Sequence, residues 1–282
     1  MIKSITLHPR SEQLVEKIIE KMPQGLIIDG PTGIGVLTVA KMIAGKLGAQ
    51  SFILQPKKKR NGEFVVDHFE GNIIIEDIRK LYEQTRTKQP NKQIYIIDTG
   101  EQSMTHSAQN AFLKLLEEPR SDVHFIIATH QFNQLLPTIV SRSLRLPLLP
   151  ITLEQTNKFI ESLQIGDKTK KTRLAFVGQG LPALMTHLAN NDKLYNDRVI
   201  IMQDAKTMIN GSPLEKFTVI NRYRENRTDS IMLIDDMNHQ LRTALRSRPD
   251  TRIVQTIEKN LDVRGRLSVG GNIRIQLVTS VL

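Results

Sequence analysis

The chain contains no cysteine and no tryptophan, and aromatic residues make up only 5% of its 282 residues. A chain without cysteine forms no disulfide bond, carries no thiolate nucleophile and offers no sulfur ligand to zinc. The seven histidines are scattered, and no two of them have the His-x-x-x-His spacing of a helical metal site. We therefore expect neither zinc nor any other bound metal.

Long hydrophobic runs are also missing. No stretch approaches the roughly 18 consecutive apolar residues that a membrane-spanning helix needs, and the amino-terminal residues are too polar for a signal peptide. The sequence therefore predicts a cytoplasmic protein without a membrane partner. Its 39% of hydrophobic and 24% of charged residues are typical of a globular protein, and its length predicts two or three domains.

Positive charge is in excess, with a formal net charge of +10. A basic protein of this size often has an acidic partner such as nucleic acid, although solubility alone explains the excess equally well. Four consecutive cations, Lys57 to Arg60, stand before Asn61 and Gly62. This run is typical of a solvated turn, and a contact with phosphate is the alternative.

Residues 94–146 organise the predicted fold. The runs Ile94–Ile97 and Phe125–Ala128 predict two buried strands, because they are apolar and rich in isoleucine. Between them, spacings of three and four indicate one helix face formed by Ala108, Ala111, Phe112, Leu115 and Leu116. A strand, a helix and a further strand predict a parallel α/β sheet. Such sheets bind ligands at the carboxyl ends of their strands, where we expect Asp98, His130 and Arg142.

A glycine-rich loop follows a third predicted strand, Leu26–Asp29, and leads into a helix. Its glycines, Gly30, Gly33 and Gly35, leave backbone N–H groups free to surround a phosphate. The active motif would continue with lysine and then serine or threonine, which hold phosphate and magnesium, but Val36 and Leu37 stand there. Either the loop still binds nucleotide weakly through backbone donors, or it is a tight turn retained for packing. We favour packing, because both stronger interactions are missing.

Capping residues indicate two helix starts. Ser11 is placed to cap the first helix, and Thr152 with Gln155 fits a capping box. Two further short helices are expected around Gly178-Gln179-Gly180, and residues 193–282 read as helical apart from a loop from Gly265 to Gly271.

A longer motif adds a resemblance to a known family. It consists of Asn110-Ala111-Phe112-Leu113-Lys114-Leu115-Leu116-Glu117-Glu118-Pro119, followed by Ser141-Arg142-Ser143. Together these runs resemble the clamp-loader branch of the AAA+ ATPases, and the resemblance covers almost the full chain. It implies an AAA+ parallel-sheet core with a degenerate phosphate-binding loop at residues 1–149, a three-helix lid at 150–192 and an all-α collar for oligomerisation at 193–282.

The resemblance also implies roles for individual residues. Asp98 occupies the place of the magnesium-directing aspartate, but Thr99 follows it where an active ATPase has a glutamate. His130 falls where the family has a residue that senses the γ-phosphate, and a hydrogen-bonded structural histidine is the alternative. In the lid, Leu181-Pro182-Ala183 contains no arginine where a second sensor would supply one. Three nucleotide-contacting features are therefore missing together.

Ser141, Arg142 and Ser143 correspond to the Ser-Arg-Cys motif of the family, whose arginine acts in trans on the ATP of a neighbouring subunit. A guanidinium is planar and permanently charged, which suits it to stabilise charge on a transferring phosphoryl group. Such an arginine needs no intact phosphate-binding loop in its own chain. A surface ion pair is the other interpretation of Arg142.

The resemblance and the missing contacts predict a non-hydrolysing, stator-type clamp-loader subunit that supports loading of a sliding clamp onto DNA. The expected partners are the other loader subunits (ATPase gamma/tau-like and delta-like), the sliding clamp, and primed DNA reached through the assembled complex. No cofactor is expected on this chain, because ATP would be bound by the partner subunits. The alternatives are a divergent DNA-stimulated AAA+ ATPase and a non-replicative interaction protein that kept the fold.

Overall fold

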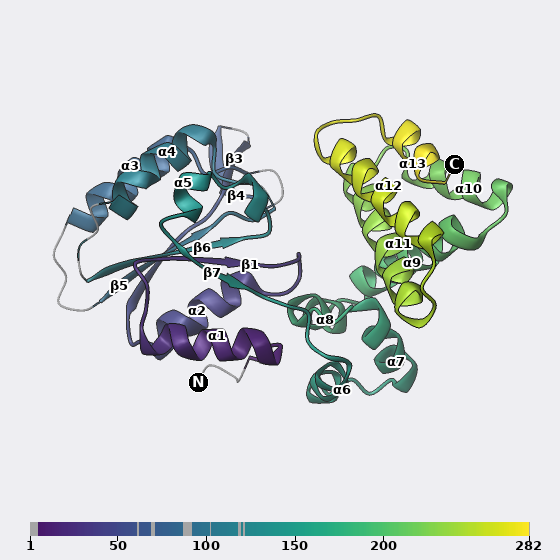
Figure 1. Cartoon of the computed structure of the whole chain (residues 1–282), viewed down its shortest axis with the longest axis horizontal. Coiled ribbons are helices and arrows are strands. Elements are labelled where there is room, and N and C mark those ends of the chain that lie inside the picture. The colour runs from purple at the N-terminus through teal and green to yellow at the C-terminus, as the bar shows by residue number, and fades with distance from the viewer. Residues whose placement is uncertain are drawn as a thin grey trace. The chain divides into compact units, whose positions relative to one another are not determined.

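The computed structural model describes residues 5–60, 62–68, 71–86, 92–101, 103–117, 120 and 122–281. The chain divides into two compact units, Met1–Ala189 and Asn190–Leu282 (Figure 1). Each unit has apolar core residues of its own. Asn61, Glu118 and Pro119, which carry parts of the predicted turn and of the long motif, lie outside the described residues. In the part of the chain that is described, no helix is long and apolar enough to cross a membrane.

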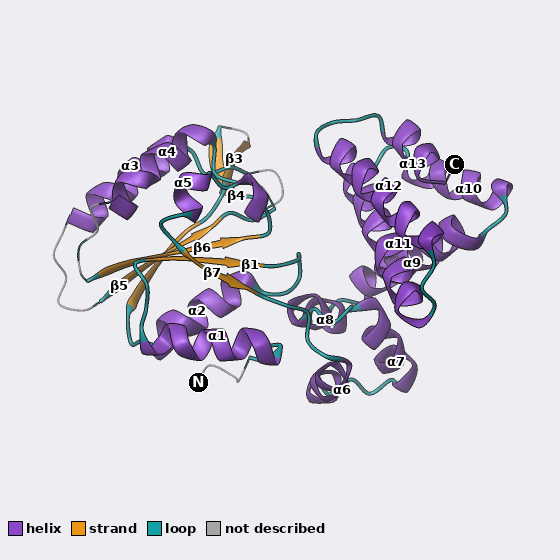
Figure 2. Cartoon of the chain, viewed as in Figure 1, coloured by secondary structure: helices purple, strands orange, loops and turns teal. Residues whose placement is uncertain are grey.

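A parallel sheet forms the centre of the first unit (Figure 2). Its strands are β1 (Gly25–Asp29), β2 (Gln50–Leu54), β5 (Gln93–Asp98), β6 (Val123–Thr129) and β7 (Leu144–Pro147). Within the described residues these five strands lie in the order β2, β5, β6, β1, β7, and every neighbouring pair is parallel. Two further strands, β3 (Lys57–Arg60) and β4 (Glu63–Val66), pair antiparallel in a separate ribbon.

Helices cover both faces of the sheet. One face carries α1 (Pro9–Glu20) and α2 (Val36–Lys46); the other carries α3 (Ile75–Arg86), α4 (His106–Glu117) and the short α5 (Pro137–Val140), which follows a 3-10 turn at Phe132–Gln134. Along β1, Leu26 and Ile28 pack into the core under α1 and α2, whereas Ile27 packs into the core on the opposite face. A strand buried on both faces reads as a continuous apolar run. The predicted strands at 26–29 and 94–97 and the parallel α/β class are therefore confirmed.

Three short helices complete the first unit: α6 (Leu153–Ser162), α7 (Lys168–Val177) and α8 (Pro182–Asn190). The capping box at the start of α6 is confirmed, since the Gln155 amide donates to Thr152 Oγ1 at 3.2 Å and the Thr152 amide donates to Gln155 Oε1 at 3.0 Å. These reciprocal bonds satisfy amides that the first turn of a helix leaves without partners.

The first helix is present, but the cap predicted for it was wrong. His8 caps α1, and Ser11 lies inside the helix, where it is almost fully buried. The Ser11 hydroxyl donates to the Pro147 carbonyl at 3.1 Å and accepts from the Leu149 amide at 3.2 Å. Ser11 therefore fastens α1 to the end of β7, a tertiary role that capping statistics do not reveal.

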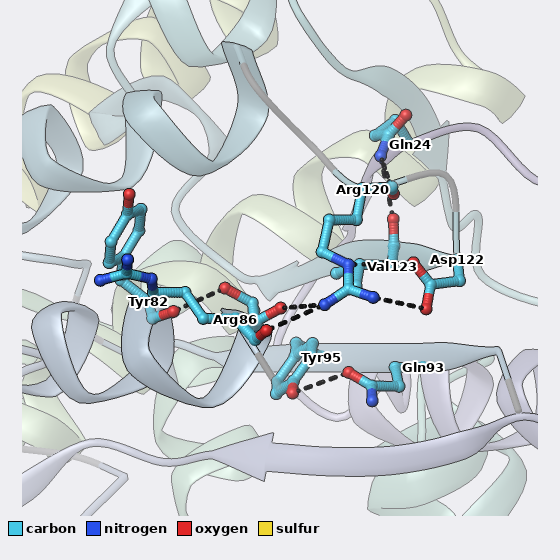
Figure 3. Close-up of polar contacts among 9 residues, drawn as sticks. Gln24, Tyr82, Arg86, Gln93, Tyr95, Arg120, Asp122 and Val123 are labelled. Carbon is cyan, nitrogen blue, oxygen red and sulfur yellow. Dashed lines mark hydrogen bonds and ion pairs between the residues drawn. The ribbon is translucent and has the colours of Figure 1, made fainter. Parts of the chain in front are cut away.

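A polar network joins α3 to the amino-terminal ends of β5 and β6 (Figure 3). The Arg120 guanidinium donates to the Arg86 carbonyl at 3.0 Å and lies 3.4 Å from the Asp122 carboxylate. Gln24 Nε2 donates to the carbonyls of Arg120 and Val123, at 2.9 and 3.0 Å. The network thus satisfies carbonyl groups where α3 ends and β6 begins, at the sheet edge away from the glycine loop.

Over its described residues, the second unit consists of helices joined by short turns. Its helices are α9 (Asp192–Asn210), α10 (Pro213–Tyr223), α11 (Arg227–Ser247), α12 (Thr251–Ser268) and α13 (Ile273–Val281). The loop predicted from Gly265 is shorter than expected, because α12 continues through Gly265 to Ser268. Ile234 and Met237 of α11 are fully buried in its apolar core. Arg198 of α9 makes two hydrogen bonds to the buried Asp236 carboxylate of α11, so an ion pair also joins these helices.

Candidate functional site

The carboxyl-terminal edge of the sheet brings the glycine loop, Asp98 and His130 together, as the sequence predicts. Asp29 at the end of β1 lies beside Thr129 in β6, and Asp98 at the end of β5 lies beside Ala128. His130 Nδ1 donates to the Gly30 carbonyl at 2.8 Å. In this structure His130 therefore fixes the start of the loop, which favours a structural role.

Arg142 is not at this edge, and that expectation was wrong. Arg142 and Ser143 precede β7, which runs parallel to β1. A Cβ built at Gly25, the first residue of β1, would lie 2.8 Å from Ser143 Oγ and 3.2 Å from the Arg142 carbonyl oxygen. The five residues of β1, at about 3.3 Å each, separate this edge from the glycine loop. Arg142 and the loop of its own chain thus lie at opposite edges of the sheet.

The glycine loop is packed against the start of α8. Gly33 and Gly35 have φ values of +85° and +99°, in the left-handed region that glycine adopts readily. The Gly33 carbonyl accepts a hydrogen bond of 2.9 Å from the Leu184 amide, and a Cβ at Gly33 would lie 2.8 Å from Leu184 Cβ. Ile34 is buried in a cluster that includes Leu181, the residue that precedes α8. The requirement for glycine is therefore explained by packing and backbone conformation.

The two residues that replace the phosphate and magnesium contacts face the interior. Val36 is 3% exposed and belongs to the core under α1 and α2, and Leu37 packs against the same core. Thr38, the next hydroxyl along α2, is exposed. The first two residues of α2 are apolar and pack into the core, so the start of this helix provides no ammonium group beside the loop.

Asp98 is 4% exposed and has partners within the chain. One carboxylate oxygen accepts from the Gly100 amide at 3.3 Å, and the other lies 3.4 Å from His68 Nδ1. The His68 carbonyl accepts from the Glu101 amide at 2.7 Å, and the Glu101 carboxylate accepts from Thr32 Oγ1 at 2.8 Å. A chain of contacts therefore runs from the Asp98 strand end to the glycine loop.

Thr99 stands where the resemblance would place a catalytic glutamate. Its side chain is buried, and its hydroxyl donates to Thr129 Oγ1 at 3.0 Å. This hydroxyl ties the ends of β5 and β6 together. Thr99 carries no charge and is held by a neighbouring strand, so it is not a base for activating water.

Sequence reasoning missed a charged pair beside the loop. Arg145 of β7 donates two hydrogen bonds of 2.8 Å to the Asp29 carboxylate, and its guanidinium carbon lies 3.6 Å from the centre of the Phe132 ring. The hydrogen bond to Asp29 raises the pKa of Arg145 above its usual value. Bidentate pairing and stacking hold this arginine in one place. No local spacing identifies the pair, because Asp29 and Arg145 are far apart in sequence.

Arg142, in contrast, is exposed on the surface of the first unit. One guanidinium nitrogen lies 2.9 Å from Glu117 Oε1, and the other donates to the Thr138 carbonyl at 3.2 Å. Both contacts are to groups at the surface, where ion pairs are weak. The neighbouring Ser143 hydroxyl is buried and has no hydrogen-bond partner among the described residues.

No arrangement of three or more histidine or acidic side chains suitable for a metal occurs within the described ranges. Gly30, Gly33, Gly35 and Asp98, the predicted nucleotide-binding residues, all have contacts within the chain. The Gly30 carbonyl accepts a hydrogen bond from His130, and the Gly33 carbonyl accepts one from the Leu184 amide. Gly35 is the N-cap residue of α2 in a left-handed conformation, and the Asp98 carboxylate contacts Gly100 and His68.

The family of the chain follows from comparison with known proteins. A family model described as "DNA polymerase III, delta subunit" matches residues 8–152, about half of the chain. The chain belongs to this AAA+ clamp-loader family.

Curated clamp-loader proteins are similar over the same half. The match to DNA polymerase III subunit delta' of Bacillus subtilis has 30% identity over 161 residues, which are 51% of this chain and 48% of that protein. The match to DNA polymerase III subunit gamma of Buchnera aphidicola subsp. Acyrthosiphon pisum has 29% identity over 155 residues, or 49% of this chain and 42% of that protein. The alignments thus span less than half the length of these curated relatives.

Solved structures share the fold over a larger part of this chain than the curated sequences match. A DNA polymerase III gamma subunit-related protein of Thermotoga maritima aligns with a TM-score of 0.53 at 20% identity, covering 96% of this chain and 97% of that one. A mutant of Thermotoga maritima RuvB aligns with a TM-score of 0.50 at 13% identity, covering 76% and 80%. At these identities the likeness concerns the fold alone, an AAA+ sheet domain followed by a helical region.

Proposed function

We propose that the chain is a non-hydrolysing, delta-prime-like subunit of the DNA polymerase III clamp loader. It supports loading of the sliding clamp onto DNA and presents Arg142 to ATP held by a neighbouring subunit. Its partners are gamma/tau-like and delta-like loader subunits, the sliding clamp, and primed DNA through the assembled complex. The proposal depends on one observation above all: Arg142 is exposed at the sheet edge opposite to the glycine loop of its own chain.

Loss of hydrolysis is supported by the state of the loop. ATP hydrolysis needs a cation on the phosphates, a hydroxyl on magnesium and a residue that positions water. The corresponding positions hold Val36, Leu37 and Thr99, of which Val36 and Thr99 are buried. Leu184 also occupies the space beside Gly33. We therefore expect no ATP hydrolysis by this chain and no bound cofactor or zinc.

A role for Arg142 in trans is supported by its accessibility and its weak local pairing. A surface ion pair such as Arg142 with Glu117 contributes about 0–1 kcal/mol, so the guanidinium can exchange its partner for a phosphate group at low cost. Because an arginine finger serves a site on another chain, the state of the loop in its own chain does not matter.

The test is DNA-stimulated ATP hydrolysis by a loader complex reconstituted with this chain. Arg142→Ala is expected to abolish hydrolysis at the one site that it serves, where such an arginine accelerates reaction by about 10³-fold or more. Arg142→Lys is not expected to restore it, since lysine lacks the planar, forked guanidinium. The melting temperature of the isolated chain should stay unchanged, because Arg142 has only surface contacts.

Glu117→Ala is the matched control. It removes the partner of Arg142 within the chain and leaves the guanidinium in place. Hydrolysis at the wild-type rate or faster is expected. An unchanged rate for Arg142→Ala in a correctly assembled complex would refute the role in trans. Tight magnesium-dependent ATP binding by the isolated chain, abolished by Asp98→Ala, would instead identify a divergent ATPase.

A further inference from the structure

The ribbon formed by β3 and β4 has no part in the proposed function. It lies outside the parallel sheet and follows directly after the edge strand β2 (Figure 1). Its register pairs Lys57 with Val66 and Lys59 with Phe64. Directly opposed residues of an antiparallel pair point to the same face, as do residues two apart in one strand. Lys57, Lys59, Phe64 and Val66 therefore form one face, which we call the ribbon face.

The ribbon face combines exposed apolar groups with cations. Phe64 is 63% exposed and Val66 is 49% exposed, and both lysines are exposed as well. Neither lysine side chain has a carboxylate partner among the residues that the structure describes. Phe64 lies directly opposite Lys59 and diagonal to Lys57, so an exposed aromatic ring and exposed apolar Val66 stand beside two cations on one face.

The ribbon is anchored at its base. Arg60 forms an ion pair of 2.7 Å with Asp67, whose amide donates to the Pro56 carbonyl at 3.0 Å. Lys57 and Asn72 exchange two backbone hydrogen bonds of 3.2 and 3.3 Å. These contacts use backbone groups and the charge of Arg60, and they leave the side chains of the ribbon face free for a partner. The face is thus held in position before any partner arrives.

We propose that the ribbon face binds single-stranded nucleic acid. An unpaired base stacks on the Phe64 ring, while the Lys57 and Lys59 ammonium groups neutralise adjacent backbone phosphates. The two lysines are about 7 Å apart along the strand, which allows each to meet a different phosphate. Base stacking on an aromatic ring and a cationic track are the two features of sequence-tolerant single-strand binding. In a duplex the bases are already stacked on one another, so Phe64 would gain little.

Charge favours nucleic acid as the partner. The chain carries a net charge of +10, and the four residues of β3 are all cationic. A polyanion with exposed ring faces complements both components of the ribbon face, whereas an acidic peptide complements the lysines alone.

The experiment measures fluorescence anisotropy of a labelled oligothymidylate with the purified full chain over a range of salt concentrations. Phe64→Ala is expected to weaken binding by roughly 5- to 150-fold, since one stacked base contributes about 1–3 kcal/mol. Lys57→Gln with Lys59→Gln should reduce the slope of log K against log salt by about 1.4, since each phosphate contact on a single strand contributes about 0.7. All three side chains are exposed, so folding should be retained, which circular dichroism checks.

Matched variants control for aromatic area and charge. Phe176→Ala removes an exposed phenylalanine of α7, and Lys41→Gln with Lys46→Gln removes two exposed cations of α2. Both are expected to bind like wild type. Equal weakening by the ribbon and control variants, preference for duplex DNA, or binding of polyglutamate in place of the oligonucleotide would each overturn the proposal. None of these measurements involves Arg142 or ATP, so they test the ribbon face independently of the proposed function.

Discussion

The Leu184 amide donates a hydrogen bond of 2.9 Å to the Gly33 carbonyl, and the Leu184 side chain occupies the space that a side chain at Gly33 would need. The glycine loop and the start of α8 therefore form one packed structure. A phosphate cradle keeps its glycines so that backbone donors can approach the ligand. Here the same glycine is required by a neighbouring leucine, which favours packing as the reason that the loop persists.

Gly33→Ala should destabilise the chain more than Gly48→Ala does. Both glycines have a positive φ, which costs a residue with a Cβ about 1–2 kcal/mol. Nothing lies within 4 Å of a Cβ at Gly48, whereas a Cβ at Gly33 would lie 2.8 Å from Leu184 Cβ. We expect an additional loss of about 1–3 kcal/mol at Gly33 from overpacking. Urea unfolding of both variants measures the difference in the free energy of unfolding. Equal losses for the two variants would mean that the contact of Leu184 with a Cβ at position 33 does not destabilise the chain.

Restoring the active loop sequence should not restore nucleotide binding. Val36→Lys with Leu37→Thr supplies the missing ammonium and hydroxyl groups, but position 36 is 3% exposed. Burying an ammonium group without a partner is unfavourable, and we expect a loss of about 3 kcal/mol in the free energy of unfolding. Calorimetric titration with magnesium and ATP should detect no gain in affinity. Micromolar affinity of the double variant for ATP would contradict this expectation and show that the loop lacked only the ammonium and hydroxyl groups.

Ser143→Ala is expected to stabilise the chain. The Ser143 hydroxyl is buried without a hydrogen-bond partner among the residues described, and an unsatisfied buried polar group costs about 1–3 kcal/mol. Alanine removes that cost and leaves the backbone unchanged, so the melting temperature should rise. Ser141→Ala is the control, because the Ser141 hydroxyl donates to the Thr138 carbonyl at 3.1 Å and its loss should bring no gain. A lower melting temperature for Ser143→Ala would reveal a hydrogen bond that the structure does not contain.

The parts of the fold that the sequence predicts are those determined by local patterns. Ile94–Ile97 reads as a strand because both faces of β5 are buried, and Thr152 with Gln155 reads as a helix start because the two side chains cap each other. Ser11 had the right chemistry for a cap. Its hydroxyl instead donates a hydrogen bond to the Pro147 carbonyl, and the local sequence around Ser11 does not reveal this distant partner.

The site depends on contacts between residues distant in sequence, which a single sequence does not specify. Arg142 was expected at the same sheet edge as Asp98. Its observed position depends on the chain returning to the start of β1 before it enters β7. The partner of Asp98 is His68, from a segment between the ribbon and α3. The resemblance predicted which nucleotide contacts are missing, whereas only the structure reveals what replaced them.

Acid should weaken the second unit through His239 of α11. Burial, and then repulsion from Arg198, Arg246 and Arg242, lowers the pKa of His239 below its usual value. The unfolded chain therefore binds a proton at His239 more readily than the folded chain, and stability falls as the pH drops below about 6.5. Hydrogen exchange of α11 amides above and below this pH should report faster opening in acid. His239→Gln should flatten that dependence, whereas substitution of the exposed His187 of α8 should leave it intact. If hydrogen exchange of the α11 amides depends on pH as strongly in His239→Gln as in the wild type, a group other than His239 causes the acid sensitivity.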